Sequence, residues 1–330
     1  MEKFRVLVTA QAAIRTAKDD LDRLRAAGAE VVVGPRIGAH PEEELVKILP
    51  GVDAVWAAAD AYTAAAFAAA DRLKIVARWG IGIDSIDLAA ATRAGVLVTN
   101  TPGMTTESVA DFAFGLMLDA ARRLTEAHNT LRAGRWEQLW GVDVWRKTLG
   151  VVGFGNIGRA MARRARGFEM TVLAFDPYVD PTAAEALGVE MVSLEVLLER
   201  SDFVTLHASL TPETCGLIGE KEIRRMKPGA FLINCGRGAL VDTRALATAL
   251  SEGRLAGAAV DVYEVEPPPP DHPLLALPNC LTLPHCASSS YDGGRAINRL
   301  CADQILAAMR GEVPPHVCNP EVLTHARALV

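Results

Sequence analysis

The chain has 330 residues, of which half are apolar and only 5% are aromatic, and its formal net charge is −6. This length exceeds one ordinary hydrophobic core and predicts two domains. Charges of both signs are spread along the chain without a long basic run, which argues against nucleic acid and membrane surfaces as partners. No segment is long and apolar enough to suggest a membrane-spanning helix.

The amino terminus passes directly into an apolar strand-like run at 4–8, without the pattern of a secretory signal. Six cysteines stand at 215, 235, 280, 286, 301 and 318 and form no CxxC pair. In a large α/β protein, cysteines without regular spacing are usually thiols rather than disulfides or metal ligands. We therefore expect a cytoplasmic protein with reduced cysteines and no bound metal.

Apolar runs of strand length alternate with amphipathic helical segments from the amino terminus onwards. The first predicted strands are 4–8, 29–33, 52–56, 74–77 and 96–98, with helical segments such as 18–27 and 42–49 between them. Gly28, Gly51 and Gly95 stand where helices should end, at left-handed caps. These elements predict a parallel β/α layer that ends near Thr99.

A long helix is predicted over 105–133, and a second β/α series follows it. The strands of this series are predicted at 148–152, 171–175, 203–207, 231–235, 258–262 and 280–283. The four prolines at 267–270 predict a stiff loop, and a last amphipathic helix is predicted over 293–310. This order suggests that the second layer is inserted into the first, and that the last helix returns to the first layer.

Residues 153–158 read Gly-Phe-Gly-Asn-Ile-Gly and match the pattern G-x-G-x-x-G. They follow a predicted strand and open a predicted helix, the context in which this pattern binds the pyrophosphate of a dinucleotide. Gly153 would permit a tight turn, Gly155 the close approach of a phosphate, and Gly158 the packing of helix on strand. N–H groups at the start of the helix would face the phosphates.

Asp176 closes the next predicted strand, 18 residues after Gly158. A carboxylate at this place accepts the ribose hydroxyls of NAD and repels the 2′-phosphate of NADP. A glycine turn without a ligand is the simpler alternative. The combination of strand, glycines, helix and acid favours NAD as the cofactor.

Polar side chains follow the last three predicted strands: Arg237, then Glu266, then His285. The carboxyl ends of strands in an open parallel sheet line one crevice, in which ligands bind. A guanidinium, a carboxylate and an imidazole there predict an anion clamp, an orienting acid and a proton donor. A turn arginine, a solvated loop acid and a surface histidine are the simpler alternatives.

The ordered set of motifs resembles the D-2-hydroxyacid dehydrogenases of the phosphoglycerate dehydrogenase type over nearly the whole chain. The segments that carry the resemblance are 80–84, 100–103, 153–158, 206–211, 234–242, 261–267 and 284–285. The resemblance implies hydride transfer between NAD and C2 of a small 2-hydroxy or 2-keto acid, usually in a homodimer. It also implies an α/β fold of two doubly wound parallel-sheet domains, with a Rossmann NAD-binding domain (100–287) inserted into a flavodoxin-like substrate domain (1–99 and the terminal helix in 288–330).

The resemblance also implies individual roles. His285 would exchange a proton with the substrate oxygen, Glu266 would bond the far ring nitrogen, and Arg237 would bind the α-carboxylate and the carbonyl oxygen. The other implied substrate contacts are the backbone of Gly80, Ile81 and Gly82. The other implied cofactor contacts are Asn156 and Ile157 at the pyrophosphate, Asp261 at the carboxamide, and the backbone of Cys235 and Gly236 beside the nicotinamide ribose. His207 is a further implied cofactor contact.

The sequence departs from common family patterns at Ala208 and Ser209, at 104–106 and at 286–288, which leaves the adenine pocket and the substrate preference open. Cys235 and Cys286 are expected to be thiols without a catalytic role, since no second base is evident near them. One alternative from another class is an NAD-gated corepressor resembling the C-terminal-binding proteins. Another is a formate- or phosphite-oxidising member of the same fold.

Two further expectations concern the substrate and the assembly. Arg78 ends a predicted strand just before the Gly80 turn and matches an arginine of phosphoglycerate dehydrogenases, so it would neutralise the far end of a three-carbon acid. Pairing with Asp84 or Asp87 is the simpler alternative. Three tryptophans at 136, 140 and 145 resemble the family's dimer arm, with Trp140 reaching toward the partner's substrate crevice. Burial of all three within one subunit is the alternative.

Overall fold

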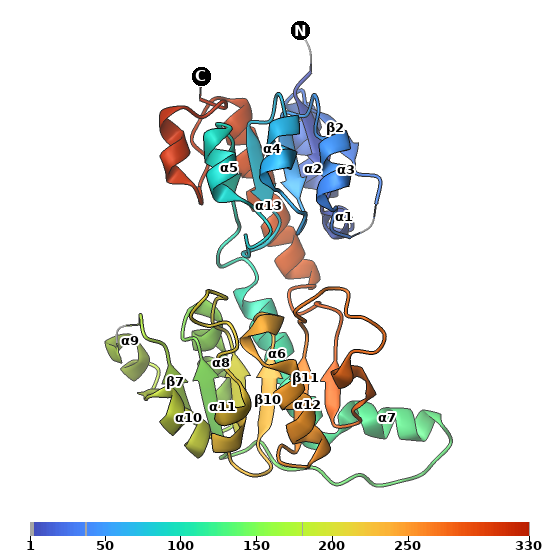
Figure 1. Cartoon of the computed structure of the whole chain (residues 1–330), viewed down its shortest axis with the longest axis vertical. Coiled ribbons are helices and arrows are strands. Elements are labelled where there is room, and N and C mark those ends of the chain that lie inside the picture. Colours follow the sequence, from blue (N-terminus) through green and yellow to red (C-terminus); the bar gives the residue numbers. More distant parts are fainter. Residues whose placement is uncertain (1–2, 37, 180, 330) are drawn as a thin grey trace. The chain divides into compact units, whose positions relative to one another are not determined.

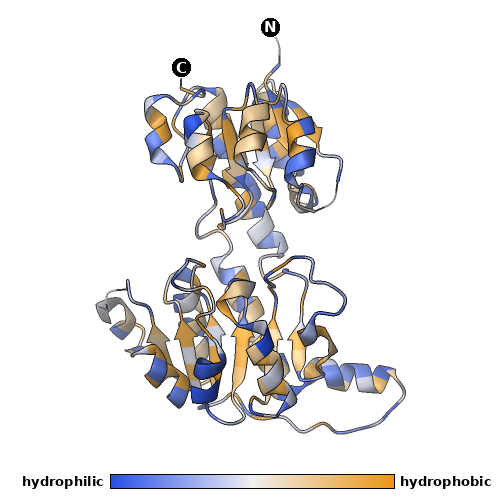
Figure 2. Ribbon diagram, in the orientation of Figure 1, coloured by the Kyte–Doolittle hydropathy of each residue, from blue (hydrophilic) through white to orange (hydrophobic). Residues whose placement is uncertain are grey.

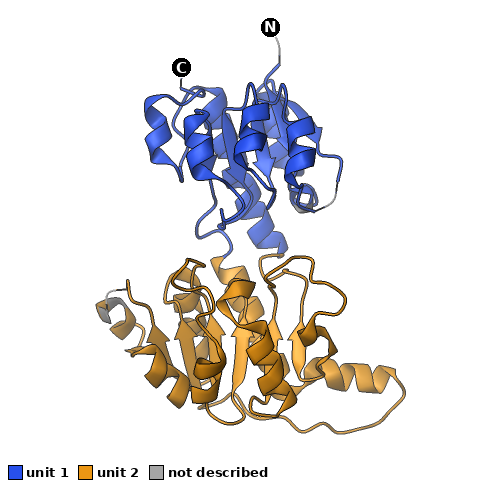
Figure 3. Ribbon diagram, in the orientation of Figure 1, with its two compact units in different colours: residues 1–105, 290–330 blue, residues 106–289 orange. Residues whose placement is uncertain are grey.

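The computed structural model describes residues 3–36, 38–179 and 181–329, and the chain divides into two compact units (Figure 1, Figure 3). Unit 1 consists of residues 1–105 and 290–330, and unit 2 consists of residues 106–289. Unit 2 is thus inserted into unit 1. The boundaries proposed from the sequence, after 99 and after 287, lie a few residues before these.

Unit 1 is built on a five-stranded sheet of order β2-β1-β3-β4-β5, in which every pairing is parallel. Its strands are β1 (Arg5–Val8), β2 (Glu30–Val33), β3 (Ala54–Ala57), β4 (Ile75–Arg78) and β5 (Leu97–Thr99). Its helices are α1 (Gln11–Ile14), α2 (Lys18–Ala26), α3 (Glu42–Ile48), α4 (Ala64–Ala69), α5 (Leu88–Arg93) and α13 (Tyr291–Met309). This strand order is that of flavodoxin-like folds.

The sheet of unit 1 separates two apolar clusters because neighbouring strand residues point to opposite faces. Val6 and Val8 pack with α2 and α13, whereas Leu7 packs with α3, α4 and α5. Both faces of a parallel sheet are therefore covered, and the strands read as continuous apolar runs. Figure 2 shows this pattern as hydrophobic strands between helices of mixed polarity.

Unit 2 is built on a seven-stranded parallel sheet of order β12-β11-β10-β9-β6-β7-β8. Its strands are β6 (Thr148–Val152), β7 (Thr171–Phe175), β8 (Glu190–Met191), β9 (Phe203–Leu206), β10 (Phe231–Asn234), β11 (Gly257–Val260) and β12 (Cys280–Thr282). Counted within the unit, the order is 3-2-1-4-5-6-7, the Rossmann arrangement with one added strand. The order reverses between β6 and β9, the point at which ligands bind in such sheets.

Helices cover both faces of the second sheet as well. Its helices are α6 (Thr106–Arg122), α7 (Leu124–Arg132), α8 (Asn156–Arg166), α9 (Pro181–Glu185), α10 (Leu194–Arg200), α11 (Glu220–Arg225) and α12 (Thr243–Ser251). One core cluster packs α6 and α8 against the sheet, and the other packs α10, α11 and α12 against the opposite face. Short 3-10 turns lie at Gly238–Leu240 and Pro273–Ala276 in unit 2, and at Pro320–Thr324 in unit 1.

The structure confirms the predicted helix caps and corrects one predicted helix. Gly28, Gly51 and Gly95 have φ values of 95°, 73° and 70°, so each is left-handed as expected. The single helix predicted over 105–133 is wrong, because the backbone turns left-handed at Arg123, with φ 56°. Asp119 stabilises this break by accepting the N–H of Thr125 at 2.7 Å.

Two other expectations about the chain can be compared with the structure. All six cysteines are free thiols, as the sequence predicted. Within the described ranges, no helix has both the length and the hydrophobicity that a membrane crossing requires.

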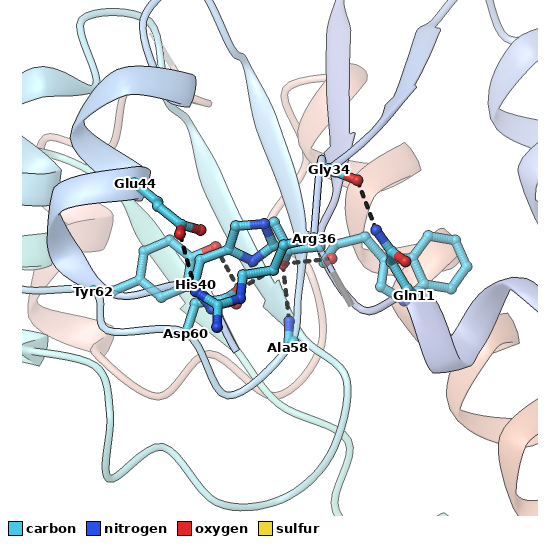
Figure 4. A network of polar contacts seen from close by, with 10 residues as sticks. Gln11, Gly34, Arg36, His40, Glu44, Ala58, Asp60 and Tyr62 are labelled. Atoms are coloured by element: carbon cyan, nitrogen blue, oxygen red, sulfur yellow. Dashed lines mark hydrogen bonds and ion pairs between the residues drawn. The ribbon is translucent and has the colours of Figure 1, made fainter. Parts of the chain in front are cut away.

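A buried polar network lies at the carboxyl ends of β1 and β3 (Figure 4). Asp60 is fully buried and accepts hydrogen bonds from the backbone N–H of His40 (2.8 Å), His40 Nδ1 (3.1 Å), Thr9 Oγ1 (2.5 Å) and Tyr62 OH (3.3 Å). Burial and the nearby carboxylate raise the pKa of Tyr62 well above its ordinary value, so its hydroxyl remains a donor. The network joins three separate segments of unit 1.

Candidate active site

The glycine loop of unit 2 has the backbone that a dinucleotide site needs. Gly153 has φ 89°, and a Cβ there would lie 2.5 Å from the backbone nitrogen of Ala208. A Cβ on Gly158 would lie 2.3 Å from the carbonyl oxygen of Gly153, so only glycine allows α8 to approach β6 this closely. At Gly155 the structure places nothing within 4 Å of that position, which leaves the space open.

The start of α8 offers N–H donors to an anion. Gly155 is the N-cap residue, and no side chain caps the helix. Asn156 and Ile157 form the first turn, whose N–H groups have no partner within an α-helix. The positive end of the helix dipole and these donors suit a phosphate group. The residues present therefore fit the pyrophosphate of NAD.

Asp176 follows β7 and is tied to the glycine loop. Its Oδ2 accepts the N–H of Phe154 at 2.8 Å, and its Oδ1 accepts the N–H of Tyr178 at 2.9 Å. A carboxylate oxygen can accept more than one hydrogen bond, so both oxygens keep capacity for ribose hydroxyls. The structure thus fixes the orientation of the acid that the sequence assigned to the adenosine ribose.

Arg237 follows β10 in a turn that Asn234 organises. Asn234 is 1% exposed, its Oδ1 accepts the N–H of Gly236 at 3.0 Å, and its Nδ2 donates to the carbonyl oxygen of Arg237 at 2.9 Å. The Arg237 guanidinium donates to the carbonyl oxygen of Gly236 at 2.9 Å. The side chain of Asn234 therefore shapes the turn that presents Cys235, Gly236 and Arg237.

Glu266 and His285 form a close pair. The Nδ1 atom of His285 lies 2.6 Å from Oε2 of Glu266, and Oε1 of the same carboxylate accepts the N–H of Tyr263 at 3.0 Å. Burial raises the pKa of Glu266, but the hydrogen bonds from His285 and Tyr263, together with the charges of His285 and Arg237, leave the pKa lowered. The carboxylate is thus negatively charged near neutral pH, beside an imidazole that is half exposed.

Asp261 supports the backbone that follows His285. This fully buried carboxylate accepts the N–H of Cys286 at 2.8 Å on Oδ1 and the N–H of Ala287 at 2.7 Å on Oδ2. His285 itself has φ 51°, a left-handed conformation that is uncommon for a non-glycine residue. Asp261 therefore stabilises the loop conformation that presents the imidazole.

The protonation states of His207, Cys235 and Cys286 in unit 2 follow from their burial. Thr205 Oγ1 lies 2.9 Å from Nε2 of His207, and burial lowers the pKa of His207 to about 4, so the ring is neutral at physiological pH. Its Nδ1 atom is buried without a hydrogen-bond partner among the described residues. Burial raises the pKa of Cys286 to about 11 and raises that of Cys235 further. Both thiols remain protonated, as expected for cysteines without a catalytic role.

In unit 1, the turn at 80–82 follows β4 and is held at Gly80. The N–H of Gly80 donates to Thr101 Oγ1 at 3.1 Å, the N–H of Thr101 donates to the carbonyl oxygen of Gly80 at 3.1 Å, and Asn100 Nδ2 donates to the carbonyl oxygen of Ile81 at 2.9 Å. The N–H groups of Ile81 and Gly82 have no acceptor in the part of the chain that the structure describes. These two donors, rather than Gly80, are available to an anion.

Arg78 lies directly beside this turn. Its Nη1 atom donates to the carbonyl oxygen of Trp79 and lies 3.0 Å from the place that a Cβ on Gly80 would occupy. Asp87, one of the two acids considered as a partner for Arg78, caps α5 by accepting the N–H of Ala90 at 2.8 Å. The guanidinium is therefore packed over the backbone of its own turn.

Sequence reasoning missed Asn234 and Thr101 as residues that shape the site. Asn234 had a local signal, because an asparagine that bonds the N–H two residues later forms an Asx turn. Thr101 had none, since its partner Gly80 lies 21 positions earlier and is reached only through the parallel pairing of β4 and β5.

Comparisons with known proteins agree with this site. Residues 114–287 match the family model described as the NAD-binding domain of the D-isomer specific 2-hydroxyacid dehydrogenases. The chain is 49% identical over 270 residues to the glyoxylate reductase of Korarchaeum cryptofilum, which covers 80% of this chain and 81% of that protein. It is 43% identical over 253 residues to the D-3-phosphoglycerate dehydrogenase of Methanocaldococcus jannaschii, covering 76% of this chain and 48% of that protein.

A solved structure shares the whole fold. The crystal structure of the TT0316 protein from Thermus thermophilus superposes with a TM-score of 0.87 at 39% identity, covering 96% of this chain and 100% of that one. Fold and site together define an NAD-dependent oxidoreductase with two doubly wound α/β units. The chain belongs to the D-isomer specific 2-hydroxyacid dehydrogenase family and interconverts a small D-2-hydroxy acid and its 2-keto acid. The corepressor alternative is not favoured.

Proposed function

We propose that the physiological substrate is a short 2-keto acid of the glyoxylate or hydroxypyruvate type, reduced with NADH. The observation that carries this proposal is the 2.6 Å contact between His285 and Glu266, next to Arg237 in the same unit. The relative with 49% identity is named glyoxylate reductase, which supports a substrate of this size.

In this proposal, bound NADH supplies the hydride that adds to C2 of the keto acid. His285 donates a proton from Nε2 to the carbonyl oxygen, because its other nitrogen is bonded to Glu266. The negative carboxylate of Glu266 favours the imidazolium that must be present before this step. Arg237 stabilises the charge that develops on the oxygen and binds the α-carboxylate.

The cofactor contacts proposed for unit 2 follow from the geometry of the loop. N–H groups at the start of α8, including those of Asn156 and Ile157, hold the pyrophosphate between Gly153 and Gly158, and Asp176 accepts the ribose hydroxyls. Asp261 is proposed at the carboxamide, in addition to the loop that it stabilises. The remaining proposed contacts are Cys235 and Gly236 beside the nicotinamide ribose, and His207.

In unit 1, we assign the substrate carboxylate to the free N–H groups of Ile81 and Gly82. Arg78 is proposed to face a polar or anionic group on C3 of a three-carbon acid. Comparison of Arg78→Ala on phosphorylated and unphosphorylated keto acids tests this role. Selective loss of kcat/KM for the phosphorylated acid supports it, and equal losses remove Arg78 from the site.

The decisive experiment for the substrate class is a panel of 2-keto acids with NADH, followed by the loss of nicotinamide absorbance. Glyoxylate and hydroxypyruvate should give the highest kcat/KM, and bulky apolar keto acids the lowest. NAD binding without turnover of any keto acid would contradict the proposal. It would instead favour the alternative of an NAD-gated corepressor-like protein.

We also infer a homodimer, formed through α7 and the segment that follows it. Leu124 and Leu131 lie two helical turns apart on one face of α7 and are 56% and 57% exposed. Trp136 and Trp140 are each 86% exposed, and Trp145 is 52% exposed. These exposures exclude the alternative that the three tryptophans are buried within one subunit. A hollow of about 420 Å³, lined in part by Trp140, lies beside this surface and can receive apolar side chains of a second copy.

Trp140 remains a proposed contact to the partner's substrate site. A cytoplasmic location is also proposed, since reduction by NADH requires the NADH pool inside the cell.

A further inference from the structure

Helix α13 carries two buried amide side chains, with a buried cysteine between them, on the face that packs against the sheet of unit 1. Asn298, Cys301 and Gln304 follow one another at intervals of three residues, and each is 0% exposed. Residues at this spacing lie on the same side of a helix. A buried amide costs free energy unless it is hydrogen-bonded. The two amides are therefore expected to have hydrogen-bond partners in the core.

Asn298 connects α13 to Trp79, the residue just before the 80–82 turn. Its Oδ1 accepts the indole N–H of Trp79 at 2.7 Å, and its Nδ2 donates to Thr16 Oγ1 at 2.8 Å and to the carbonyl oxygen of Ala13 at 3.2 Å. Asn298 thus makes three hydrogen bonds, and one of them fixes the side chain that precedes Gly80.

Gln304 connects α13 to the other flank of the same turn. Its Nε2 donates to the carbonyl oxygens of Asn100 at 2.8 Å and of Pro315 at 3.2 Å, and its Oε1 accepts the hydroxyl of Thr99 at 2.9 Å. Asn100 in turn donates to the carbonyl oxygen of Ile81. Between the two amides, the Cys301 thiol lies 3.8 Å from the carbonyl oxygen of Arg78.

We propose that Asn298 and Gln304 are positioning residues for the carboxylate-binding turn and set the affinity for the keto acid rather than for the cofactor. The inference rests on the proposed role of the 80–82 turn. Asn298 holds the turn through Trp79 and Gln304 holds it through Asn100, so that the N–H groups of Ile81 and Gly82 keep one orientation. Two N–H donors bind a carboxylate well only when their directions are fixed in advance.

Three variants test the inference. Asn298→Leu removes the acceptor for the Trp79 indole, and Trp79→Phe removes the indole N–H itself. Gln304→Met removes all three hydrogen bonds of that amide at similar volume. Each should raise KM for glyoxylate about tenfold, the effect of losing one well-placed buried hydrogen bond. The kcat should change much less, and the Kd for NADH should remain that of the unaltered enzyme, because the glycine loop and Asp176 belong to unit 2.

The effects of substituting Asn298 and Trp79 on KM should not be independent. Because both single changes break the same hydrogen bond, the double variant should raise KM by less than the product of the two single effects. Effects that multiply fully would show that the two residues act independently, and would overturn the proposed coupling. Trp79→Phe also keeps the test valid if Asn298→Leu does not fold.

Asn319 offers a matched control in the same unit. It is 2% exposed, its Oδ1 accepts the N–H of Val98 at 2.9 Å, and its Nδ2 donates to Thr92 Oγ1 and to the carbonyl oxygen of Val96. Asn319→Leu therefore loses three buried hydrogen bonds that do not reach the 80–82 turn, and it should lower Tm without raising KM.

The outcomes separate the inference from the function on which it rests. An unaltered enzyme that reduces no 2-keto acid contradicts the proposed function. An enzyme that reduces glyoxylate, while Asn298→Leu, Trp79→Phe and Gln304→Met keep its KM, overturns the inference alone. An equal rise of KM in Asn319→Leu would also overturn it, because the effect would then reflect the general stability of unit 1.

Discussion

Nδ1 of His285 lies 2.6 Å from Oε2 of Glu266, although the two residues stand 19 positions apart on different loops of unit 2. The contact occupies one ring nitrogen and leaves Nε2 as the nitrogen that can exchange a proton. Asp261 fixes the backbone after His285 through the N–H groups of the next two residues. The imidazole is therefore oriented both through its ring and through its main chain.

Glu266→Gln tests the electrostatic part of this contact. The lowered pKa of Glu266 keeps its carboxylate charged until the pH falls below the ordinary range, so its support of the imidazolium is present at neutral pH and is lost only in acid. The amide lacks this charge, so the pH above which kcat/KM for keto-acid reduction declines should move to lower pH. Some activity should remain. An unshifted profile would mean that Glu266 is only a loop acid.

Replacement of the proton donor His285 or of the anion-binding Arg237 should lower the rate of catalysis without weakening cofactor binding. His285→Ala and Arg237→Ala should each reduce kcat for keto-acid reduction by about 10²–10⁴-fold, the range expected for a proton donor or an oxyanion-stabilising group. The Kd for NADH, measured by fluorescence titration, should stay nearly unchanged. Arg244→Ala, a nearby substitution on α12, serves as the control and should retain full activity. Comparable loss in that control would refute the assignment.

Asp176→Ala should change the choice between cofactors. Without the carboxylate, the ribose hydroxyls lose their acceptor and the 2′-phosphate of NADPH loses its repulsion. The Kd for NADH should rise about tenfold, the equivalent of roughly one charge-assisted hydrogen bond, and the preference for NADH should narrow. Steady-state kinetics with both cofactors measures the outcome. Equal efficiency with NADH and NADPH in the unaltered enzyme would disprove the role of Asp176.

The network around Asp60 should contribute to stability rather than to catalysis. Asp60→Ala leaves the buried donors of His40 and Tyr62 without an acceptor (Figure 4). It also leaves Thr9 Oγ1 with only its 3.4 Å contact to the carbonyl oxygen of Trp56, so the free energy of unfolding should fall by about 3–5 kcal/mol. Urea denaturation gives the value. Asp22→Ala removes a surface ion pair with Arg25 and should cost no more than about 1 kcal/mol. Similar losses in both variants would show that the network is not the cause.

The exposed apolar face of α7 should be needed for assembly. Leu124→Glu combined with Leu131→Glu places charges on the surface proposed to meet a second copy, so the protein should become monomeric. Light scattering at micromolar concentration measures the mass. A control with glutamate at the exposed Lys221 of α11 should leave the assembly unchanged. A monomer in the unaltered protein would rule out the dimer.

Much of this protein was determined by local sequence. The alternation of apolar runs with amphipathic segments predicted both parallel sheets, because strand and helix periods are properties of neighbouring residues. Glycines at helix ends and in the loop 153–158 predicted caps and a dinucleotide site, because only glycine meets their steric demands. The candidates Arg237, Glu266 and His285 were identified from their places after strands and from the family resemblance.

Only the tertiary structure shows the features that depend on hydrogen bonds to residues elsewhere in the folded chain. The helical pattern of 105–133 gave no sign of the break at Arg123, which Asp119 stabilises through Thr125. Asn298 and Gln304 read as ordinary residues of an amphipathic helix, yet they bond Trp79 and Asn100 some two hundred positions earlier. A buried polar group must find its partner wherever the packed chain brings one, and this choice belongs to the folded core rather than to any local stretch of sequence.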